Sequence, residues 1–233
     1  MRRRRSGHRS PPLLLCFCAL FLAPASLLPG QSEVDSQIIF TLWVGLEPAI
    51  AAGEETPRSE ERAAELLFLE ARYVLGGLVY GYEYEYVPSD RTRDIAEQFS
   101  LEPQAEIRRG DPRLEALDSY KKDKRVYTQF LYRLEPFQQQ WLESWSSSSL
   151  PRVGGSGEVP WWDGHEAKLE AIEAAVKSAI RNHLRSRTRN KPRRSRGSVI
   201  LTEEPRIYVD AGQYRAEVSV RIRVDQVDDY EVY

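Results

Sequence analysis

Residues 214–224 read YRAEVSVRIRV, and this stretch decides the fold class. An apolar or aromatic side chain stands at every even position, and Arg, Glu or Ser stands at every odd position. This period of two predicts a long strand of an antiparallel sheet, with one face buried and the other in solvent. Two shorter strands are predicted at 198–202 and 206–209, and Asp-Ala-Gly at 210–212 predicts the turn into the long strand.

A helix is predicted just before these strands. It starts with a capping-box-like pair, Asp163 and Glu166. Its apolar stripe has helical spacing and comprises Leu169, Ile172, Val176 and Ile180. Alanines between 167 and 179 would let this helix lie close against a sheet. The helix and the hairpin together resemble small envelope modules attached to bacterial surface or motility machinery, and the resemblance implies binding to another envelope component.

The first half of the chain predicts further strands and another helix. Residues 37–46 (QIIFTLWVGL) are β-branched and apolar on both faces, as in a central buried strand. Thr-Pro at 56–57 is expected to open a helix, and the glycines at 76–77 are expected to end it. Strands are predicted at 78–87 and 124–134.

Turn-forming residues divide the rest of the chain. A short helix is predicted over 90–99, and residues 100–123 are polar and rich in turn signals. Residues 144–160 (SWSSSSLPRVGGSGEVP) predict a linker or a long loop. This boundary separates an N-terminal part over 26–143 from a C-terminal part over 161–233. The predicted class is α+β, with helices packed on one face of an antiparallel sheet and two αβ parts joined by the linker.

The beginning of the chain predicts a cleavable signal peptide over residues 1–25. An arginine-rich start precedes the apolar stretch 13–22 (LLLCFCALFL), and Ala-Pro-Ala at 23–25 provides the small residues of a cleavage site. Cleavage at the end of this triplet is favoured over cleavage after Gly30. The apolar stretch 13–28 is about sixteen residues long, short of the ~20 that span a bilayer. We therefore favour a signal peptide over an uncleaved anchor, and expect no transmembrane span after cleavage.

Removal of the leader changes the composition of the chain. Both cysteines lie in the leader, so the mature chain has none and is expected to be stable without disulfides. The leader carries five arginines and no acidic residue, which leaves 28 basic against 35 acidic side chains and a net charge of −7. An acidic chain argues against a general nucleic-acid binder. The missing cysteines and the missing Asn-x-Ser/Thr sequon favour export to a bacterial periplasm, or secretion.

The mature chain offers few residues for catalysis. Its two histidines, His165 and His183, have no ligand-spaced neighbours, and no HExxH, GxxxxGK[ST] or GxSxG motif occurs. We therefore expect no metal, no cofactor and no enzyme activity.

One strand supports a competing hypothesis. Two sets of side chains alternate along it: Tyr80, Tyr82, Tyr84 and Tyr86 on one face, Glu83 and Glu85 on the other. A row of tyrosines can form a platform for a glycan, and two carboxylates can act as the acid and base of a hydrolase. We favour the simpler interpretation, in which the tyrosines cover a core and the glutamates lie on a solvated face.

Two surfaces are candidates for binding a partner. Trp161 and Trp162 follow the predicted linker, and aromatic side chains in such a place can anchor a partner or fold back onto the domain. The run 181–196 (RNHLRSRTRNKPRRSR) contains no acidic residue. Its basic residues are Arg181, Arg185, Arg187, Arg189, Lys191, Arg193, Arg194 and Arg196. Such a run is typical of a site for an anionic lipid, an envelope polymer or an acidic protein, or of a solvated helix end.

The leading hypothesis is an exported, non-catalytic protein of the cell envelope that binds another envelope protein or an anionic envelope surface. The competing hypothesis is a glycan-directed binder or hydrolase that uses the tyrosine strand. The surroundings of Glu83 and Glu85, either a cleft or a flat solvated face, distinguish the two hypotheses.

Overall fold

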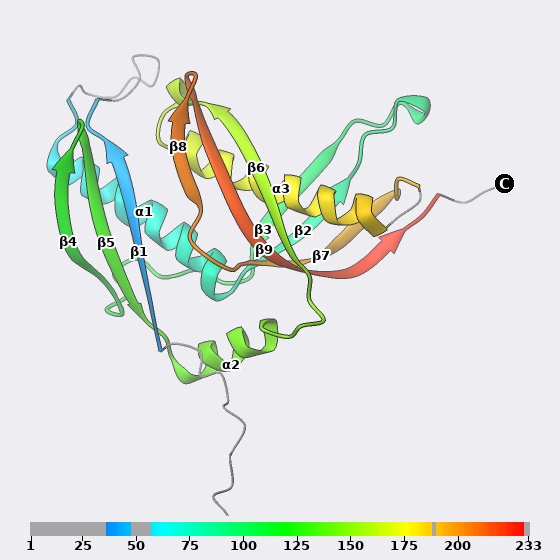
Figure 1. The fold of residues 1–233 in the computed structure, drawn as a ribbon, viewed down its shortest axis with the longest axis horizontal. Coiled ribbons are helices and arrows are strands. Elements are labelled where there is room, and N and C mark those ends of the chain that lie inside the picture. The colour runs from blue at the N-terminus through cyan, green and yellow to red at the C-terminus, as the bar shows by residue number, and fades with distance from the viewer. Residues whose placement is uncertain (1–35, 48–56, 188–189, 231–233) are drawn as a thin grey trace, which may run out of the picture. The chain divides into compact units, whose positions relative to one another are not determined.

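The computed structural model describes residues 36–47, 57–187 and 190–230 (Figure 1). These residues form antiparallel sheets and three α-helices, which confirms the predicted α+β class. The helices are α1 (Glu60–Val79), α2 (Pro136–Trp145) and α3 (Glu166–Arg187). The strands are β1 (Gln37–Gly45), β2 (Tyr82–Val87), β3 (Gln98–Pro103), β4 (Leu114–Lys122), β5 (Arg125–Arg133), β6 (Arg152–Pro160), β7 (Arg194–Leu201), β8 (Arg206–Asp210) and β9 (Gln213–Asp228). The predicted signal peptide, residues 1–25, lies outside the described residues.

The long predicted strand is β9, and it organises the larger sheet. This six-stranded sheet has the order β3-β2-β7-β9-β6, and β8 also pairs with β9. Buried side chains alternate with partly exposed ones from Tyr214 to Ile222, as the sequence predicted. The turn before β9 holds Ala211 and Gly212 at φ angles of 48° and 76°. Two consecutive residues with positive φ are typical of the type I′ turn that joins two tightly paired strands.

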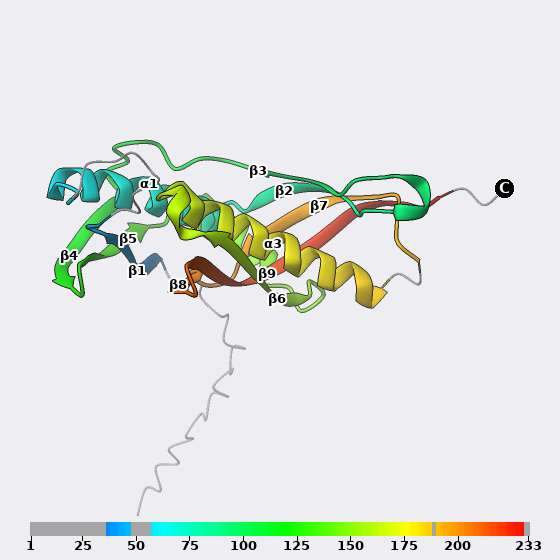
Figure 2. The same ribbon diagram turned by 90° about the horizontal axis from the view of Figure 1, so that it is seen from above.

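The helix α3 packs on β6 and β9 and approaches β6 very closely (Figure 2). A Cβ atom added at Gly155 would lie 2.1 Å from the carbonyl oxygen of Ala175. One added at Gly157 would lie 2.4 Å from the carbonyl oxygen of Ala171. Both distances are too short for a real Cβ contact. The predicted close approach of an alanine-rich helix to a sheet therefore occurs where β6 has glycines.

The prediction of a linker over 144–160 is wrong for most of that stretch. Trp145 ends α2, and residues 152–160 form β6. The Gly/Ser composition was misleading because two of the glycines make room for α3. Strands β2 and β3 share one sheet with β6 to β9, so no linker separates an N-terminal from a C-terminal αβ part. All described residues belong to one unit, Val34–Tyr233.

The strand β1 is an edge strand and not the central buried strand that we predicted. It pairs with β5 in a three-stranded sheet of order β1-β5-β4, and Ile39 is 50% exposed. Side chains from other elements bind the free edge of β1. Lys168 Nζ of α3 donates to the carbonyl oxygen of Trp43 at 2.6 Å. The carboxylate of Glu204 accepts from the N–H of Thr41 at 2.9 Å. These side chains occupy the place of a neighbouring strand and tie the small sheet to α3 and to the β7–β8 connection.

The helix α1 begins and ends later than predicted. Ser59 caps it, and the Ser59 hydroxyl accepts from the N–H of Arg62 at 3.1 Å. The two glycines that we expected to end the helix lie inside it. At Gly77 an added Cβ would lie 2.5 Å from the Tyr82 hydroxyl, so this glycine serves packing. Gly81, at a φ of 79°, turns the chain from α1 into β2.

Residues 89–123 contain more strand than predicted. Asp90 caps a single 3₁₀ turn, Arg91–Arg93, rather than a helix that extends to residue 99. Strands β3 and β4 occupy much of the stretch that we predicted to be turns. Both are edge strands of their sheets, and most of their side chains are exposed or only partly buried. A strand that buries so little carries a weak hydrophobic pattern, which explains the error.

Candidate functional site

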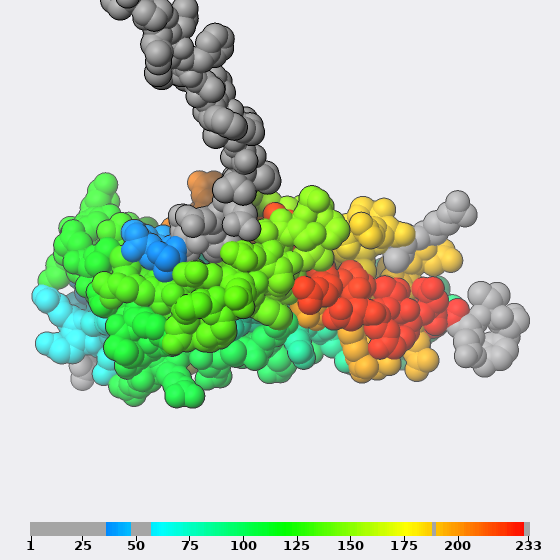
Figure 3. All heavy atoms as spheres, turned by 90° about the horizontal axis from the view of Figure 1, so that it is seen from below, coloured from blue at the N-terminus to red at the C-terminus, as the bar shows by residue number. Residues whose placement is uncertain are grey.

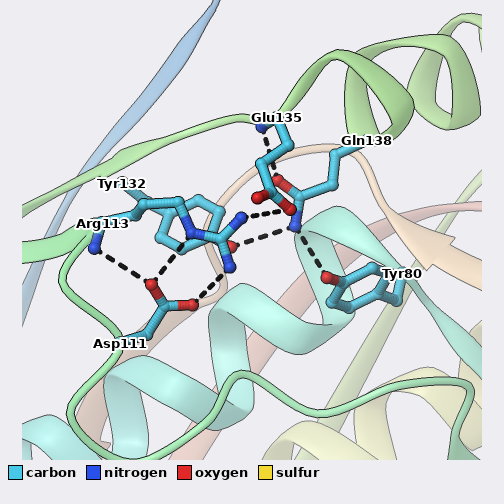
Figure 4. Close-up of polar contacts among 6 residues, drawn as sticks. All are labelled: Tyr80, Asp111, Arg113, Tyr132, Glu135 and Gln138. Carbon is cyan, nitrogen blue, oxygen red and sulfur yellow. Dashed lines mark hydrogen bonds and ion pairs between the residues drawn. The ribbon is translucent and has the colours of Figure 1, made fainter.

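Figure 4 shows a polar cluster at the start of α2 that the sequence did not indicate. The guanidinium of Arg113 donates to both carboxylate oxygens of Asp111, at 2.9 and 2.7 Å, and forms an ion pair with Glu135. The hydrogen bonds from Arg113 lower the pKa of Asp111, although partial burial opposes this shift. The three side chains join the loop before β4 to the start of α2.

The same cluster contains Gln138, which is fully buried. Its amide nitrogen donates to the hydroxyls of Tyr80 and Tyr132, at 2.7 and 3.0 Å, and its amide oxygen accepts from the N–H of Glu135 at 2.8 Å (Figure 4). Both donors and the acceptor of the amide are therefore used within the protein. A buried network that is satisfied in this way stabilises the fold, and we assign it a structural role.

A second cluster is a buried ion pair between α1 and α3. Glu70 and Lys168 are 0% and 1% exposed, and Lys168 Nζ lies 2.7 Å from the Glu70 carboxylate. Burial raises the pKa of Glu70 and lowers the pKa of Lys168, and each charge opposes the shift of the other. His165 lies beside them, with Nε2 3.3 Å from Glu70. Burial and the positive charge of Lys168 lower the pKa of His165 to about 3, so the imidazole is neutral near pH 7.

The tyrosine strand belongs to the core. Tyr82, Tyr84 and Tyr86 are 1%, 3% and 3% exposed, whereas Glu83 and Glu85 lie on the opposite, more exposed face of β2. Tyr80 follows the last residue of α1 and is bound by Gln138. The hypothesis that the tyrosines form a binding platform is therefore wrong for Tyr82, Tyr84 and Tyr86, and the interpretation of these tyrosines as core residues is confirmed.

The two tryptophans that we predicted as a contact surface are partly exposed. Trp161 and Trp162 are 37% and 46% exposed and lie in a short 3₁₀ turn that ends at Asp163. The N–H of Trp161 donates to the carbonyl oxygen of Gly212 at 3.2 Å, which places this turn beside the β8–β9 turn. Asp163 therefore belongs to this turn and does not form the predicted capping box with Glu166, at which α3 begins.

The predicted basic run does not form one surface in the fold. Arg196 of β7 donates to Glu85 of β2 at 2.6 Å, and Arg194 lies 2.9 Å from Asp228 of β9. The hydrogen bond from Arg196 is the largest cause of the lowered pKa of Glu85. Figure 3 shows the paired ends of β7 (orange) and β9 (red) at the surface. The charges of Arg194 and Arg196 are thus matched by acidic neighbours.

Three other cations of the run line a hollow beside the end of α3. Arg181 and Arg185 belong to α3, and Lys191 belongs to the connection that follows it. The hollow has a volume of about 240 Å³. Lys191 Nζ donates to the carbonyl oxygen of Ser89 at 2.9 Å. Within the part of the chain that the structure describes, none of the three cations forms an ion pair. We refer to this feature as the basic hollow.

One acidic residue, Glu97, also lines the basic hollow. Its carboxylate accepts from the Tyr86 hydroxyl at 2.8 Å and lies 3.3 Å from Lys177 Nζ, which is not in the lining. Burial together with the hydrogen bond to Glu97 raises the pKa of Tyr86 to about 12. Lys177 pairs with Glu97 from outside the hollow, and the charge of Arg181 also lowers the pKa of Glu97. One acidic residue thus faces three cations, and the lining keeps an excess of positive charge.

The remaining members of the run lie elsewhere. Arg187 and Arg193 are exposed, and neither lines the basic hollow. Arg189 lies outside the described residues. The basic residues are therefore contiguous in the sequence but lie at different places in the fold. Sequence reasoning did not place Tyr86 and Pro88 near this run, because they come from β2 and the residues just after it.

Two properties of the described residues concern metal ions and membrane spans. No group of three or more His, Cys, Asp and Glu side chains in this part of the chain could hold a metal ion. Among the same residues, no helix combines the length and the apolar composition that a membrane-spanning helix requires.

The fold and the basic hollow define an α+β protein with a small cationic site on its surface. A family model that carries no description of a function matches residues 26–230, and the chain belongs to this family. An "Uncharacterized protein" of Treponema pallidum (strain Nichols) is 24% identical over 199 residues, which cover 84% of this chain and 83% of that protein. No solved structure matches the chain.

Proposed function

We propose that the protein is an exported, non-catalytic component of the bacterial cell envelope that binds an anionic envelope partner through the basic hollow. The observation that carries this proposal is the position of Arg181, Arg185 and Lys191, which line one hollow and form no ion pair with a described residue. In a chain with a mature net charge of −7, acidic residues are plentiful. Arg194 and Arg196 form ion pairs with two of them, Asp228 and Glu85. Cations that stay unmatched in such a protein are available to a negatively charged partner.

Export and a bacterial envelope are supported by the sequence and by the relative. The predicted leader ends at Ala25, and the family match begins at the next residue, Ser26. The curated relative comes from a bacterium. A mature chain without cysteine is suited to an oxidising compartment, because no thiol can be mispaired.

The non-catalytic character is proposed from the polar clusters described above. Most polar atoms of the Arg113 and Gln138 network and of the Glu70–Lys168 pair are in hydrogen bonds or ion pairs within the protein. The tyrosines of the competing hypothesis are buried, and Glu85 is held by Arg196. Turnover of a glycan by the purified protein, lost in Glu83→Gln or Glu85→Gln, would restore the competing hypothesis.

The experiment is co-sedimentation of protein, purified from a host that exports it, with vesicles that contain anionic lipid or with purified envelope polymer. The test variant replaces Arg181, Arg185 and Lys191 with Gln. Each cation near an anionic surface contributes about 1 kcal/mol, so loss of three should weaken capture about 100-fold. Capture by wild type should also fade as salt rises, because the Debye length falls from ~10 Å at 0.1 M to ~3 Å at 1 M.

The matched control replaces Arg108, Arg109 and Arg187 with Gln, which removes the same charge from exposed positions outside the basic hollow. We expect this control to be captured nearly as well as wild type. Equal capture of the test variant and the wild type would show that the basic hollow does not bind the envelope partner.

A further inference from the structure

We propose that the basic hollow binds one phosphate group, the terminal group of a phosphomonoester, rather than diffuse negative charge. This inference rests on the proposed function and names the chemistry of its ligand. It is carried by the concave shape of the site, by the directions from which its cations come, and by the donors that they leave free.

The cations of the basic hollow come from two elements. Arg181 and Arg185 stand four residues apart, so they project from the same face of α3 about one turn, or ~5.4 Å, apart. Lys191 enters from the connection after the helix, and its bond to the Ser89 carbonyl holds it in place. An ammonium group has three donors, so two remain for a ligand. A ligand in the hollow therefore meets donors from both sides.

Part of the wall of the hollow is apolar. It is formed by Pro88, Pro192 and Leu184, all buried, together with Tyr86, whereas Ser89 and Glu97 add polar groups to the lining. Such walls exclude water from one side of a bound anion, and a lower local dielectric strengthens charged hydrogen bonds. A volume of about 240 Å³ accepts one small head group. A bilayer surface or a polymer backbone meets only the rim, so diffuse charge would leave the hollow unfilled.

The number of donors favours phosphate over carboxylate. A carboxylate carries one charge and two coplanar oxygens, which a single guanidinium fork satisfies. A phosphomonoester carries three terminal oxygens and a charge between −1.5 and −2 near pH 7. Two guanidinium groups, one ammonium group and the neighbouring amide of Asn190 supply more donors than a carboxylate can accept. Glu97 adds one negative charge to the lining. Lys177 pairs with it from outside the hollow and Arg181 also acts on it, so the lining of the hollow keeps a net positive charge.

The test is isothermal titration of the exported protein with glycerol 3-phosphate and, separately, with acetate. We expect saturable binding of the phosphomonoester and much weaker binding of acetate. Arg181→Gln and Arg185→Gln should each weaken phosphomonoester binding about 10- to 100-fold, because each removes hydrogen bonds to a charged group. Arg185→Lys should weaken it less than Arg185→Gln, since the charge stays but the fork is lost. Arg187→Gln, on the same helix but outside the hollow, should bind like wild type.

A second arm identifies the source of the phosphate. Vesicles with phosphatidic acid present the same group on a lipid, and glycerol 3-phosphate should compete for capture if the lipid head group enters the hollow. Soluble binding without vesicle capture supports a soluble or glycan-linked phosphomonoester. Either result supports the inference.

Two results would overturn the inference while the proposed function stands. One is acetate binding as tight as that of glycerol 3-phosphate. The other is no binding of either small anion, although the Arg181, Arg185 and Lys191 triple variant still loses capture by anionic vesicles or polymer. By contrast, full capture of that triple variant would refute the proposed function itself.

Discussion

The two ends of α3 use their cations in opposite ways. Near its start, Lys168 is 1% exposed and bonds both the Glu70 carboxylate and the Trp43 carbonyl oxygen. Near its end, Arg181 and Arg185 are exposed and form no ion pair with a described residue. The same helix therefore carries one cation that is buried with its partners and two cations that are exposed without an ion pair to a described residue.

The difference follows from the surroundings of each charge. A charge in the protein interior loses its hydration, so it must find partners or lose its proton. A charge at the surface is hydrated, and an ion pair there adds little to stability. Cations at the start of α3 are thus expected to control folding, and those at the end are expected to control binding. The following substitutions test that division.

Lys168→Ala is expected to have the largest effect. It leaves Glu70 buried without its partner and removes the donor to the Trp43 carbonyl at the free edge of β1. Breaking a buried pair by removing one member costs about 3–5 kcal/mol. Urea denaturation should show this loss as a lower free energy of unfolding.

The control for this prediction removes both charges together, as Glu70→Leu with Lys168→Met. Replacing a buried pair by apolar side chains is often close to neutral, so the double variant should be more stable than Lys168→Ala. A Lys168→Ala protein as stable as wild type would show that the pair does not fasten the start of α3.

Gly157→Ala should have the next largest effect, because it pushes the middle of α3 away from the sheet. The new Cβ would lie 2.4 Å from the backbone of Ala171 and Ala175, and overpacking of this kind costs about 1–3 kcal/mol. Gly154→Ala is the matched control, since its Cβ would lie 3.8 Å from the nearest atom, the carbonyl oxygen of Val218. Equal unfolding free energies for the two variants would mean that α3 does not depend on this contact.

His165 should make the start of α3 sensitive to acid. Burial, with Lys168 and Arg58 nearby, holds the pKa of His165 at about 3 in the folded protein, against about 6.5 in the unfolded chain. Between these values the unfolded chain binds more protons, so stability falls as the pH falls, by at most about 1.4 kcal/mol per pH unit. The loss begins near pH 6.5 and is complete near pH 3.

The measurement compares wild type with His165→Asn by urea denaturation at pH 7 and pH 5. The decrease in unfolding free energy between the two pH values should be smaller in the variant. The same decrease in both proteins would contradict the assignment of a neutral, buried imidazole.

Periodic segments of the fold were predictable and sparsely buried segments were not. Strand β9 and helix α3 each bury one face, so their side chains carry a clear period of 2 or 3.6. The sequence predicts a linker in place of strand β6 because Gly155 and Gly157 occupy the middle of its inner face, and glycine adds nothing to a hydrophobic pattern. Strand β1 was placed at the centre of a sheet because the sequence does not show that Lys168 and Glu204 bind its free edge.

The candidate site was predictable only as a charge run. Arg196 and its partner Glu85 are 111 residues apart, and Lys168 and Glu70 are 98 apart, so no local signal indicates which cation is matched. Arg194 and Arg196 lie across from Glu85, on the face of the sheet opposite to Tyr86. The folded chain therefore separates cations that are adjacent in the sequence.

Arg185→Gln and Arg187→Gln are expected to have the smallest effect on stability, and an equal one. Both arginines lie in the last turn of α3, where a cation stabilises the helix dipole by about 0.3–1 kcal/mol. Both are exposed, so neither substitution leaves a buried charge unmatched. Their unfolding free energies should therefore fall together and by far less than that of Lys168→Ala. Binding should separate them, because Arg185 lines the basic hollow and Arg187 does not. If Arg185→Gln instead lost as much stability as Lys168→Ala, the end of α3 would be essential for the stability of the fold. Weaker binding in that variant would then reflect unfolding rather than the loss of a ligand contact.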